Sequence, residues 1–307
     1  MSVRFDDDNT SAREAGGDPV SAGPVAVGSL TGSPVDLEAY LRKVGVEAGS
    51  PDLAGLQRLH EAHVRTFTFD NIDVLLEQHP GVELADVQAK FVGRGRGGYC
   101  FEHATLFSAV LAALGHDVER RLARVGDVTA SARTHCVVTA RLDGTRWLAD
   151  PGFGLSLLHP IPLEDGAQED HGGWTYRIQR VDTPASGATW QLQRQRDGGW
   201  ELMHTTDELP VQQVDLRAGH HFTSTYPTSH FRHGLMVTRH LPDRHVAVTH
   251  ETVTVRQPGH PTRHHQLAEG ELQGLLADLK VGLTDEETER LLAVVAGLRS
   301  RRAAQSP

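Results

Sequence analysis

The hydrophobic period of the chain changes at Val118, and this change limits the possible folds more than any other feature. Before it, apolar residues recur roughly every three to four positions in the segments 36–45 and 52–67, which is typical of amphipathic helices. After it, apolar and polar residues alternate in short segments: 118–125, 135–142, 145–150, 174–181, 189–196 and 200–206. Such alternation indicates strands, and the Asp-Gly and Gly-rich turns between several of them indicate antiparallel pairing. We therefore expect an α+β protein whose sheet forms a barrel.

Further periodic segments flank this region. We expect two more helices before the sheet, in the segments 83–92 and 100–114. We expect more strands after it, in the segments 235–241 and 245–255. Gly115 ends the helix that precedes the sheet. Two helices close the chain, and the last begins at a capping box formed by Thr284 and Glu287. The chain is thus helical first, then all-β, then mixed.

Composition excludes several classes of function. Residues 1–34 are rich in Gly, Ser, Pro, Asp and Ala without any period, so we expect a disordered extension there. This segment starts with acidic residues where a signal peptide would be basic and then apolar, and no apolar run reaches the roughly 20 residues of a membrane span. With 40 acidic and 30 basic residues, the formal net charge of -10 argues against non-specific binding of nucleic acid or anionic membranes. We expect a cytoplasmic protein whose two cysteines, Cys100 and Cys136, stay reduced.

The stretch "GRGRGGYCFE" at 93–102 places several glycines directly before a cysteine and a helix. Gly93, Gly95 and Gly98 fit the dinucleotide fingerprint G-x-G-x-x-G, but that motif follows a buried strand, and the segment 85–92 has a helical pattern. A phosphate-binding loop would need a Gly-Lys-Ser/Thr sequence, which does not follow. Neither kind of nucleotide site is therefore expected.

Two interpretations of Cys100 stay open at this point. Cys100 is either an ordinary buried cysteine after a flexible connection, or a nucleophile. Glycines permit a sharp turn, and a thiol in the first turn of a helix lies at the positive end of the helix dipole, which lowers its pKa. The unpaired N–H groups of that turn could also bind an oxyanion. A nucleophile would need a base and an orienting acid from elsewhere in the chain.

The histidines offer many candidate bases, since the chain has 19 of them. His60 and His63 lie three residues apart on a predicted helix, but they do not form the H-E-x-x-H motif, and the pairs His220/His221 and His264/His265 lie among loop-like residues. With two cysteines and no coherent ligand spacing, we expect no metal site.

His135 has a more informative neighbourhood. Asp143-Gly144 is a strong two-residue hairpin signal, and such a turn would place His135 and Asp150 on the same face of the sheet as diagonal neighbours. The same register turns Cys136 to the opposite face, although a three-residue turn with a bulge would reverse the assignment. If the two-residue turn forms, the sequence offers Cys100, His135 and Asp150 as nucleophile, base and orienting acid.

These motifs resemble those of the arylamine N-acetyltransferase family. "RGGYCFE" at 96–102 resembles the family's nucleophile motif, "RTH" at 133–135 its histidine motif, and "DPGFG" at 150–154 its aspartate motif. "LHEAH", "KFV" and "STYPTSHF" occur in the matching order at 59–63, 90–92 and 224–231. The resemblance covers roughly residues 35 to 300.

The resemblance implies a three-domain fold similar to that of cysteine proteases. After the extension 1–34, it implies a helical bundle at 35–117 with Cys100, a β-barrel at 118–225 with His135 and Asp150, and an α/β lid at 226–307. It also implies ping-pong transfer of an acetyl or other acyl group from coenzyme A, through a thioester on Cys100, to an aromatic amine or hydrazine. Acetyl-CoA is then a co-substrate, and no cofactor is permanently bound.

The resemblance also implies roles around the triad. Ser224, Thr225, Ser229 and Phe231 fall in the segment that contacts the coenzyme, Phe153 falls where a ring lines the acceptor pocket, and Arg96 is expected to pair with Asp70 in a buried ion pair. The chain departs from the family pattern at Asp70, which replaces a glutamate, and at Cys136 and Pro151. These departures leave the triad intact.

Three other functions are compatible with this sequence. A branch with the same triad forms amides in polyketide pathways, where it closes a macrolactam or releases an acyl chain from an acyl carrier protein. A cysteine hydrolase could use the same triad, because water can also cleave an acyl-cysteine. A catalytically silent binding protein is the third, which the intact triad disfavours.

Overall fold

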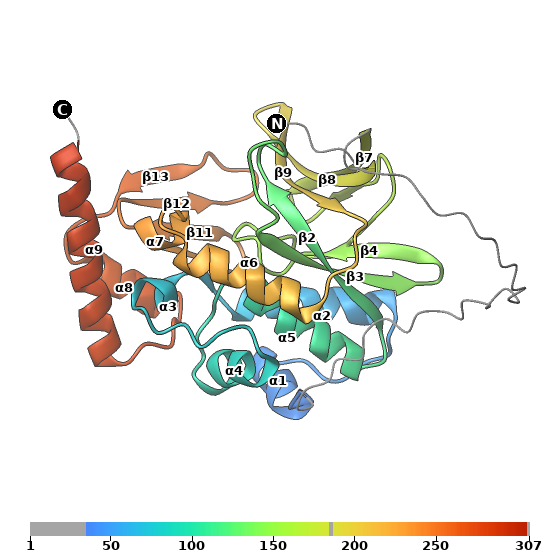
Figure 1. Ribbon diagram of the computed structural model, residues 1–307, viewed down its shortest axis with the longest axis horizontal. Helices are drawn as coiled ribbons and strands as arrows, with labels where there is room; N and C mark the ends of the chain where they lie inside the picture. Colours follow the sequence, from blue (N-terminus) through green and yellow to red (C-terminus); the bar gives the residue numbers. More distant parts are fainter. Residues whose placement is uncertain (1–34, 184–186, 306–307) are drawn as a thin grey trace, which may run out of the picture. The chain divides into compact units, whose positions relative to one another are not determined.

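A computed structural model describes residues 35–183 and 187–305 of the chain (Figure 1). The predicted disordered extension, residues 1–34, lies outside the described residues. The described part has an α+β fold in which helices accompany an eight-stranded and a five-stranded sheet, both antiparallel.

The N-terminal helices form where the periodic segments predict them. They are α1 (Leu37–Val44), α2 (Leu53–Thr66), α3 (Ile72–Leu75), α4 (Leu84–Gln88) with a π-helical continuation (Ala89–Gly93), and α5 (Cys100–Ala113). Asp36 and Asp52 cap α1 and α2 by accepting hydrogen bonds from backbone N–H groups at 2.9 and 2.7 Å. Helix α5 is apolar on nearly every side and therefore lies buried between the other helices and the sheet.

The alternating segments form one antiparallel sheet in the order β5-β4-β3-β2-β9-β8-β7-β6. Its strands are β2 (Asp117–Val125), β3 (His135–Leu142), β4 (Thr145–Ala149), β5 (Ile161–Pro162), β6 (Gln168–Asp170), β7 (Thr175–Thr183), β8 (Gly187–Arg196) and β9 (Gly199–Asp207). The outer strand β5 also contacts β7, so the sheet curls into a nearly closed barrel, as the sequence predicts.

Strands β3 and β4 pair in the predicted register. Leu142 lies opposite Thr145, and Val138 lies opposite Ala149. The turn residues Asp143 and Gly144 have φ values of 48° and 83°, the left-handed conformations that a two-residue hairpin of this kind requires. The alternative three-residue turn is therefore excluded, and Asp150 follows directly after the end of β4.

Strand β3 separates two cores. Cys136 and Val138 pack into the core around α5, whereas Val137 packs into the barrel core. The prediction that His135 and Cys136 face opposite sides of the strand is thereby confirmed. Cys136 is fully buried, as expected of a core cysteine, but the core that it enters also contains Cys100.

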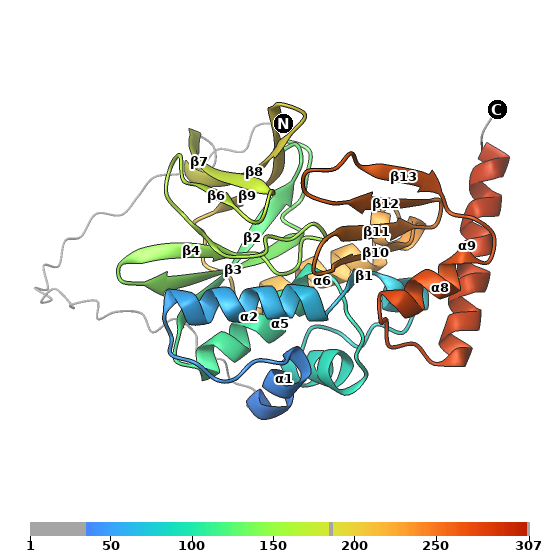
Figure 2. The same cartoon turned by 180° about the vertical axis from the view of Figure 1, so that it is seen from behind.

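The C-terminal part builds the second sheet, in the order β1-β10-β11-β12-β13. Its strands are β1 (Phe69–Asp70), β10 (Met236–His240), β11 (His245–Thr249), β12 (Thr252–Arg256) and β13 (Arg263–Gln266). Helices α8 (Glu271–Asp278) and α9 (Asp285–Gln305) pack on it around a shared apolar core (Figure 2). The predicted strand 245–255 is two strands, because the Thr249 hydroxyl accepts hydrogen bonds from the N–H groups of Glu251 and Thr252 and the chain reverses there.

Two helices between the sheets were not predicted. They are α6 (Gln213–Thr225) and α7 (His230–His233). Gly219 weakens the helical pattern of α6, but it allows close packing, since a Cβ there would lie 2.6 Å from the Phe101 ring of α5. The expectation that two histidine pairs lie in loops is wrong. His220 and His221 lie in α6, and His264 and His265 lie in β13. None of the helices in the described ranges is long and apolar enough to cross a membrane.

Candidate active site

Cys100 is the first residue of α5, and a glycine-rich loop leads into it. The Asp70 N–H donates to the Gly98 carbonyl at 2.7 Å, and the Gly98 N–H donates to the Thr68 carbonyl at 3.2 Å. A Cβ at Gly97 would lie 1.9 Å from that same Thr68 oxygen. The glycines therefore allow two backbones to approach closely, and the loop before the thiol is held by hydrogen bonds rather than being a flexible connection.

The loop after Asp150 packs directly on the start of α5. A Cβ at Gly152 would lie 2.9 Å from both the Cα of Cys100 and the Cβ of His103. Only glycine lets this loop come so close to the helix. The close contact brings the carboxylate of Asp150, two residues earlier, into the neighbourhood of the thiol.

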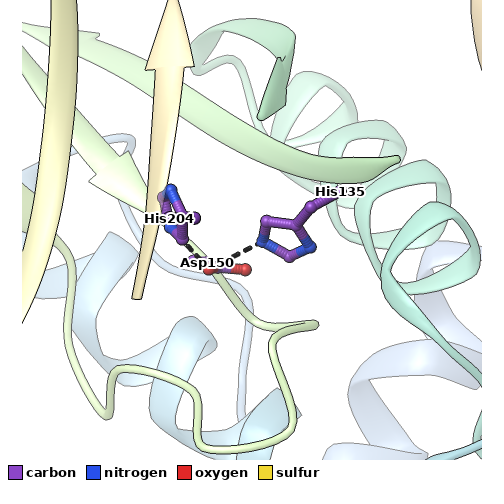
Figure 3. A group of neighbouring side chains, drawn as sticks. All are labelled: His135, Asp150 and His204. Carbon is purple, nitrogen blue, oxygen red and sulfur yellow. Dashed lines mark hydrogen bonds and ion pairs between the residues drawn. The ribbon is translucent and has the colours of Figure 1, made fainter. Parts of the chain in front are cut away.

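His135 and Asp150 form the predicted hydrogen bond. The His135 Nε2 and the Asp150 Oδ2 are 3.0 Å apart, and both side chains are buried. Because an ionised carboxylate only accepts, Nε2 carries the hydrogen, and in the neutral form of the ring Nδ1 keeps a free lone pair. Figure 3 shows this second ring nitrogen pointing away from Asp150. A histidine in this state can accept a proton at Nδ1.

Asp150 remains ionised although it is fully buried. Burial opposes ionisation, but the charge of His135 and the hydrogen bonds from His135 and His204 outweigh it and hold the pKa of the Asp150 carboxyl below its usual range. An ionised carboxylate at this position stabilises the protonated form of His135.

The surroundings of Cys100 raise its pKa, whereas the helix dipole alone predicts a lowered one. Burial raises the pKa of Cys100 well above its ordinary value, and the backbone N–H groups of Cys136 and Phe101 only partly oppose this. The thiol donates to the carbonyl of Thr134, the residue before His135, with an S···O distance of 3.5 Å. Within the described residues no hydrogen bond joins Cys100 to His135; such catalytic hydrogen bonds often form only when substrate binds.

His204 is a member of the site that the sequence did not indicate. Its Nε2 lies 3.1 Å from the same Asp150 Oδ2, so two imidazoles converge on one carboxylate oxygen (Figure 3). His204 belongs to β9, which pairs with β2 and β8 rather than with β3 or β4. No local turn signal links β9 to the β3–β4 hairpin. Strand β9 pairs with β2, which pairs with β3, and this order of strands in the curled sheet brings His204 to Asp150.

His135, Asp150 and His204 also offer three potential metal-ligand atoms within 4.8 Å of one another. The two hydrogen bonds to Asp150 account for this spacing without an ion, because they already use Nε2 of each imidazole. We therefore interpret the cluster as a hydrogen-bonded group.

Comparisons with known proteins identify the family of the chain. The sequence model of the N-acetyltransferase family matches residues 52–286. The chain belongs to the arylamine N-acetyltransferase family. The Mycolicibacterium smegmatis enzyme of this name is 35% identical over 239 residues, which cover 73% of this chain and 84% of that enzyme. The Salmonella typhimurium arylamine N-acetyltransferase / N-hydroxyarylamine O-acetyltransferase is 31% identical over 274 residues, which cover 84% and 95%.

Solved structures of arylamine N-acetyltransferases have the same fold. The Mycobacterium abscessus enzyme superposes with a TM-score of 0.79 at 34% identity, and the match covers 85% of this chain and 95% of that enzyme. The Mycobacterium marinum enzyme, solved in complex with CoA, also has a TM-score of 0.79, at 31% identity over 86% and 99% of the two chains. The chain is thus an acyltransferase with the arylamine N-acetyltransferase fold.

In this arylamine N-acetyltransferase, Arg96 forms a buried ion pair, but not with the predicted partner. Its guanidinium pairs with Asp73 and with Glu287, where Nη2 and Oε2 are 2.6 Å apart. Lys90 joins the same network through Asp73 at 3.0 Å and Glu102 at 2.7 Å. The network connects the loop before Cys100 to α3, α5 and α9.

The predicted pair between Arg96 and Asp70 is wrong. The Asp70 carboxylate accepts hydrogen bonds from the Thr68 hydroxyl at 2.7 Å and from the Ile72 N–H at 3.2 Å. It is therefore turned toward the start of α3, whereas Asp73, inside that short helix, faces the guanidinium.

The residues assigned to the coenzyme lie around α6 and α7. Ser224 and Thr225 end α6, and Ser229 precedes α7. Each of these hydroxyls donates to a backbone carbonyl of its own segment. The ring of Phe231 packs 5.3 Å from that of Tyr99, the residue before Cys100. Phe153, assigned to the acceptor pocket, lies edge-on to His135, with 5.2 Å between ring centroids.

Proposed function

We propose that the enzyme transfers an acetyl group from acetyl-CoA to an aromatic amine or hydrazine through a thioester on Cys100. The observation that carries the proposal is a buried cysteine at a helix start, packed against the loop of an ionised aspartate that hydrogen-bonds a histidine. Membership of a family named for this reaction supports the choice of donor and acceptor.

In the first half-reaction, His135 accepts the thiol proton at Nδ1 while the sulfur of Cys100 attacks the acetyl carbonyl carbon. The bond between that carbon and the sulfur of coenzyme A breaks, and His135 returns the proton to the departing thiolate. Asp150 stabilises the transient imidazolium through Nε2. Because burial raises the pKa of Cys100, the thiol depends on this proton transfer to become a nucleophile.

In the second half-reaction, the amine nitrogen attacks the thioester carbon and gives a proton to His135. The bond between the carbon and the sulfur of Cys100 breaks, and the proton goes to that sulfur. The amide leaves and the resting enzyme is restored. The proposed reaction needs no cofactor beyond the acyl donor and no acyl carrier protein.

The coenzyme contacts follow from the hydroxyls around α6 and α7. Ser224, Thr225 and Ser229 each donate their hydrogen within the protein, so we assign their oxygens to the coenzyme as acceptors rather than donors. Acceptors of this kind suit the amide N–H groups of the pantetheine arm better than the phosphates. We assign Phe231 to the same surface and Phe153, beside His135, to the wall of the amine pocket.

Steady-state kinetics test the proposal. With acetyl-CoA and an arylamine such as an aminobenzoate varied together, a thioester intermediate predicts parallel double-reciprocal lines and formation of the acetylated amine. Replacing Ser224 and Ser229 together by alanine should raise the KM for acetyl-CoA more than the KM for the amine. Intersecting lines, or release of acetate without amide, would contradict the proposed transfer.

A further inference from the structure

His204 gives Asp150 a second imidazole partner that the transfer mechanism does not use. His135 comes from β3, Asp150 follows β4 and His204 comes from β9, so three segments of the barrel meet at one carboxylate (Figure 3). The two imidazoles approach Oδ2 from different sides. The Gly152 N–H lies 3.4 Å from the other carboxylate oxygen.

Burial favours the neutral form of His204, and the hydrogen bond to Asp150 selects one tautomer of that form. It is fully buried, and burial lowers its pKa although the hydrogen bond to Asp150 acts in the opposite direction. Because Nε2 donates to Asp150, Nδ1 has no hydrogen, and Nδ1 has no hydrogen-bond partner in the part of the chain that the structure describes. A buried ring nitrogen without a partner is unfavourable, so packing alone gives no reason for a histidine here.

Without His204, the Asp150 carboxylate would keep His135 on Oδ2 and only the long contact from the Gly152 N–H on Oδ1. A second donor on Oδ2, from a different side, restrains rotation about the Cβ–Cγ bond further. The rings of His135, His204 and Phe153 also pack against one another, with centroids 5.0 to 5.6 Å apart. His204 therefore restrains Oδ2 in the direction of Nε2 of His135. Other titratable groups interact electrostatically with Asp150 at longer range: Cys100, Cys136, His60 and Tyr176.

We propose that His204 is a positioning residue for the transfer reaction: it orients Asp150 toward His135 and so stabilises the imidazolium that forms when Cys100 loses its proton. The inference rests on the proposed function for its role in catalysis. The ion pair between thiolate and imidazolium can nevertheless be measured without any acyl donor.

The test follows alkylation of Cys100 by iodoacetamide as a function of pH, with peptide mass spectrometry to locate the label. In His204→Phe the imidazolium of His135 is stabilised less well by Asp150, so less Cys100 thiolate forms at neutral pH. We expect alkylation at pH 7 to be about tenfold slower, an effect typical of losing a residue that hydrogen-bonds a directly acting group. The pH at the midpoint of the alkylation profile should rise by about one unit. The rate at high pH, where the thiol ionises without help, should be unchanged.

Two variants separate positioning from packing. His204→Gln keeps an N–H near the position of Nε2 and should restore most of the wild-type profile. His171→Phe is the matched control, because His171 is a buried histidine of the same barrel that packs on Tyr176 and does not contact Asp150. Its profile should equal that of the wild type. If His204→Phe does not fold, His204→Asn, whose shorter amide cannot reach Asp150 from this position, takes its place.

The inference is overturned if the His204→Phe profile matches the wild type, if His204→Gln shifts as far as His204→Phe, or if His171→Phe shifts equally. Acetylation of the wild type is measured in parallel. A wild-type protein that acetyl-CoA does not acetylate would count against the proposed function, while the alkylation profiles would still decide the role of His204.

Discussion

At the scale of single residues, Asp150 determines the chemistry of the site. Both imidazoles, His135 and His204, form hydrogen bonds to its Oδ2. In the proposed mechanism Cys100 and His135 supply the reacting atoms, and the thiol needs the base because burial raises its pKa.

Replacing Asp150 by asparagine should preserve the packing but remove the charge. The imidazolium then loses its stabilisation, and the rate of Cys100 acylation should fall by about 10⁴, the effect of the equivalent change in a serine protease triad. The rate is measured as coenzyme A release in a single turnover. Asp117→Asn, at an exposed position of β2, is the matched control and should acylate normally. An Asp150→Asn enzyme within tenfold of the wild type would show that the carboxylate charge is not needed.

At the scale of elements, the start of α5 depends on Glu102. The Glu102 carboxylate accepts from the Tyr99 N–H at 3.1 Å and so closes the first turn of the helix that carries Cys100. It also lies 2.7 Å from Lys90 and 3.0 Å from His79. Burial acts to raise the pKa of Glu102, but the charges of Lys90 and His79 outweigh it and hold the pKa at about 2.

This pKa predicts how stability depends on pH. Because the folded value lies below the value of about 4.3 in an unfolded chain, Glu102 stabilises the fold above that pH, and this stability is lost as the pH falls toward 2. Glu102→Gln should lower the free energy of unfolding at pH 7 by about 3 kcal/mol, the lower end for breaking a buried pair.

The measurement is thermal or urea unfolding between about pH 3 and 7. The difference between Glu102→Gln and the wild type should shrink as the pH falls. A difference that is constant across this range would contradict the assignment of the stabilising charge to Glu102.

At the scale of the whole molecule, the ion pairs of Arg96 tie α9 to the loop before the thiol. Arg96 is fully buried and reaches Asp73 in α3 and Glu287 in α9. Asp73→Ala should therefore leave two buried cations, Arg96 and Lys90, with fewer partners and cost about 3–5 kcal/mol. Asp70→Ala, which removes hydrogen bonds but no direct ion pair, should cost about 1–2 kcal/mol. Urea denaturation compares the two, and an equal or larger loss for Asp70→Ala would contradict the assignment.

The sequence predicted those parts of the molecule that depend on local signals. The Asp143-Gly144 turn defined the register of β3 and β4, and that register was sufficient to bring His135 and Asp150 together. The glycine loop and the helix that starts at Cys100 were likewise local features. The motif resemblance then supplied the family and fold.

The features that the sequence missed depend on distant segments. His204 reaches Asp150 only because the barrel curls, and Glu287 reaches Arg96 only because α9 packs near the glycine loop. The thiol pKa was predicted with the wrong sign, because the helix dipole can be inferred from the sequence whereas burial by surrounding elements cannot. Helix α6 was missed because Gly219 lowers the helical propensity of the segment, while its role is to allow close packing on Phe101.

The central claim is that Cys100 carries the acyl group between the two substrates. The direct measurement mixes the enzyme with acetyl-CoA alone and locates any added acetyl group by mass spectrometry of the digested protein. The account predicts one equivalent of released coenzyme A and one acetyl group on the peptide containing "GGYCFE", which an arylamine then removes as the amide. Cys136→Ala should retain this burst and Cys100→Ala should lose it. Labelling of Cys100 only by a carrier-bound acyl chain would assign the enzyme to amide synthesis instead. An acetyl group on Cys136, or no acetylation before amine is added, would contradict the account.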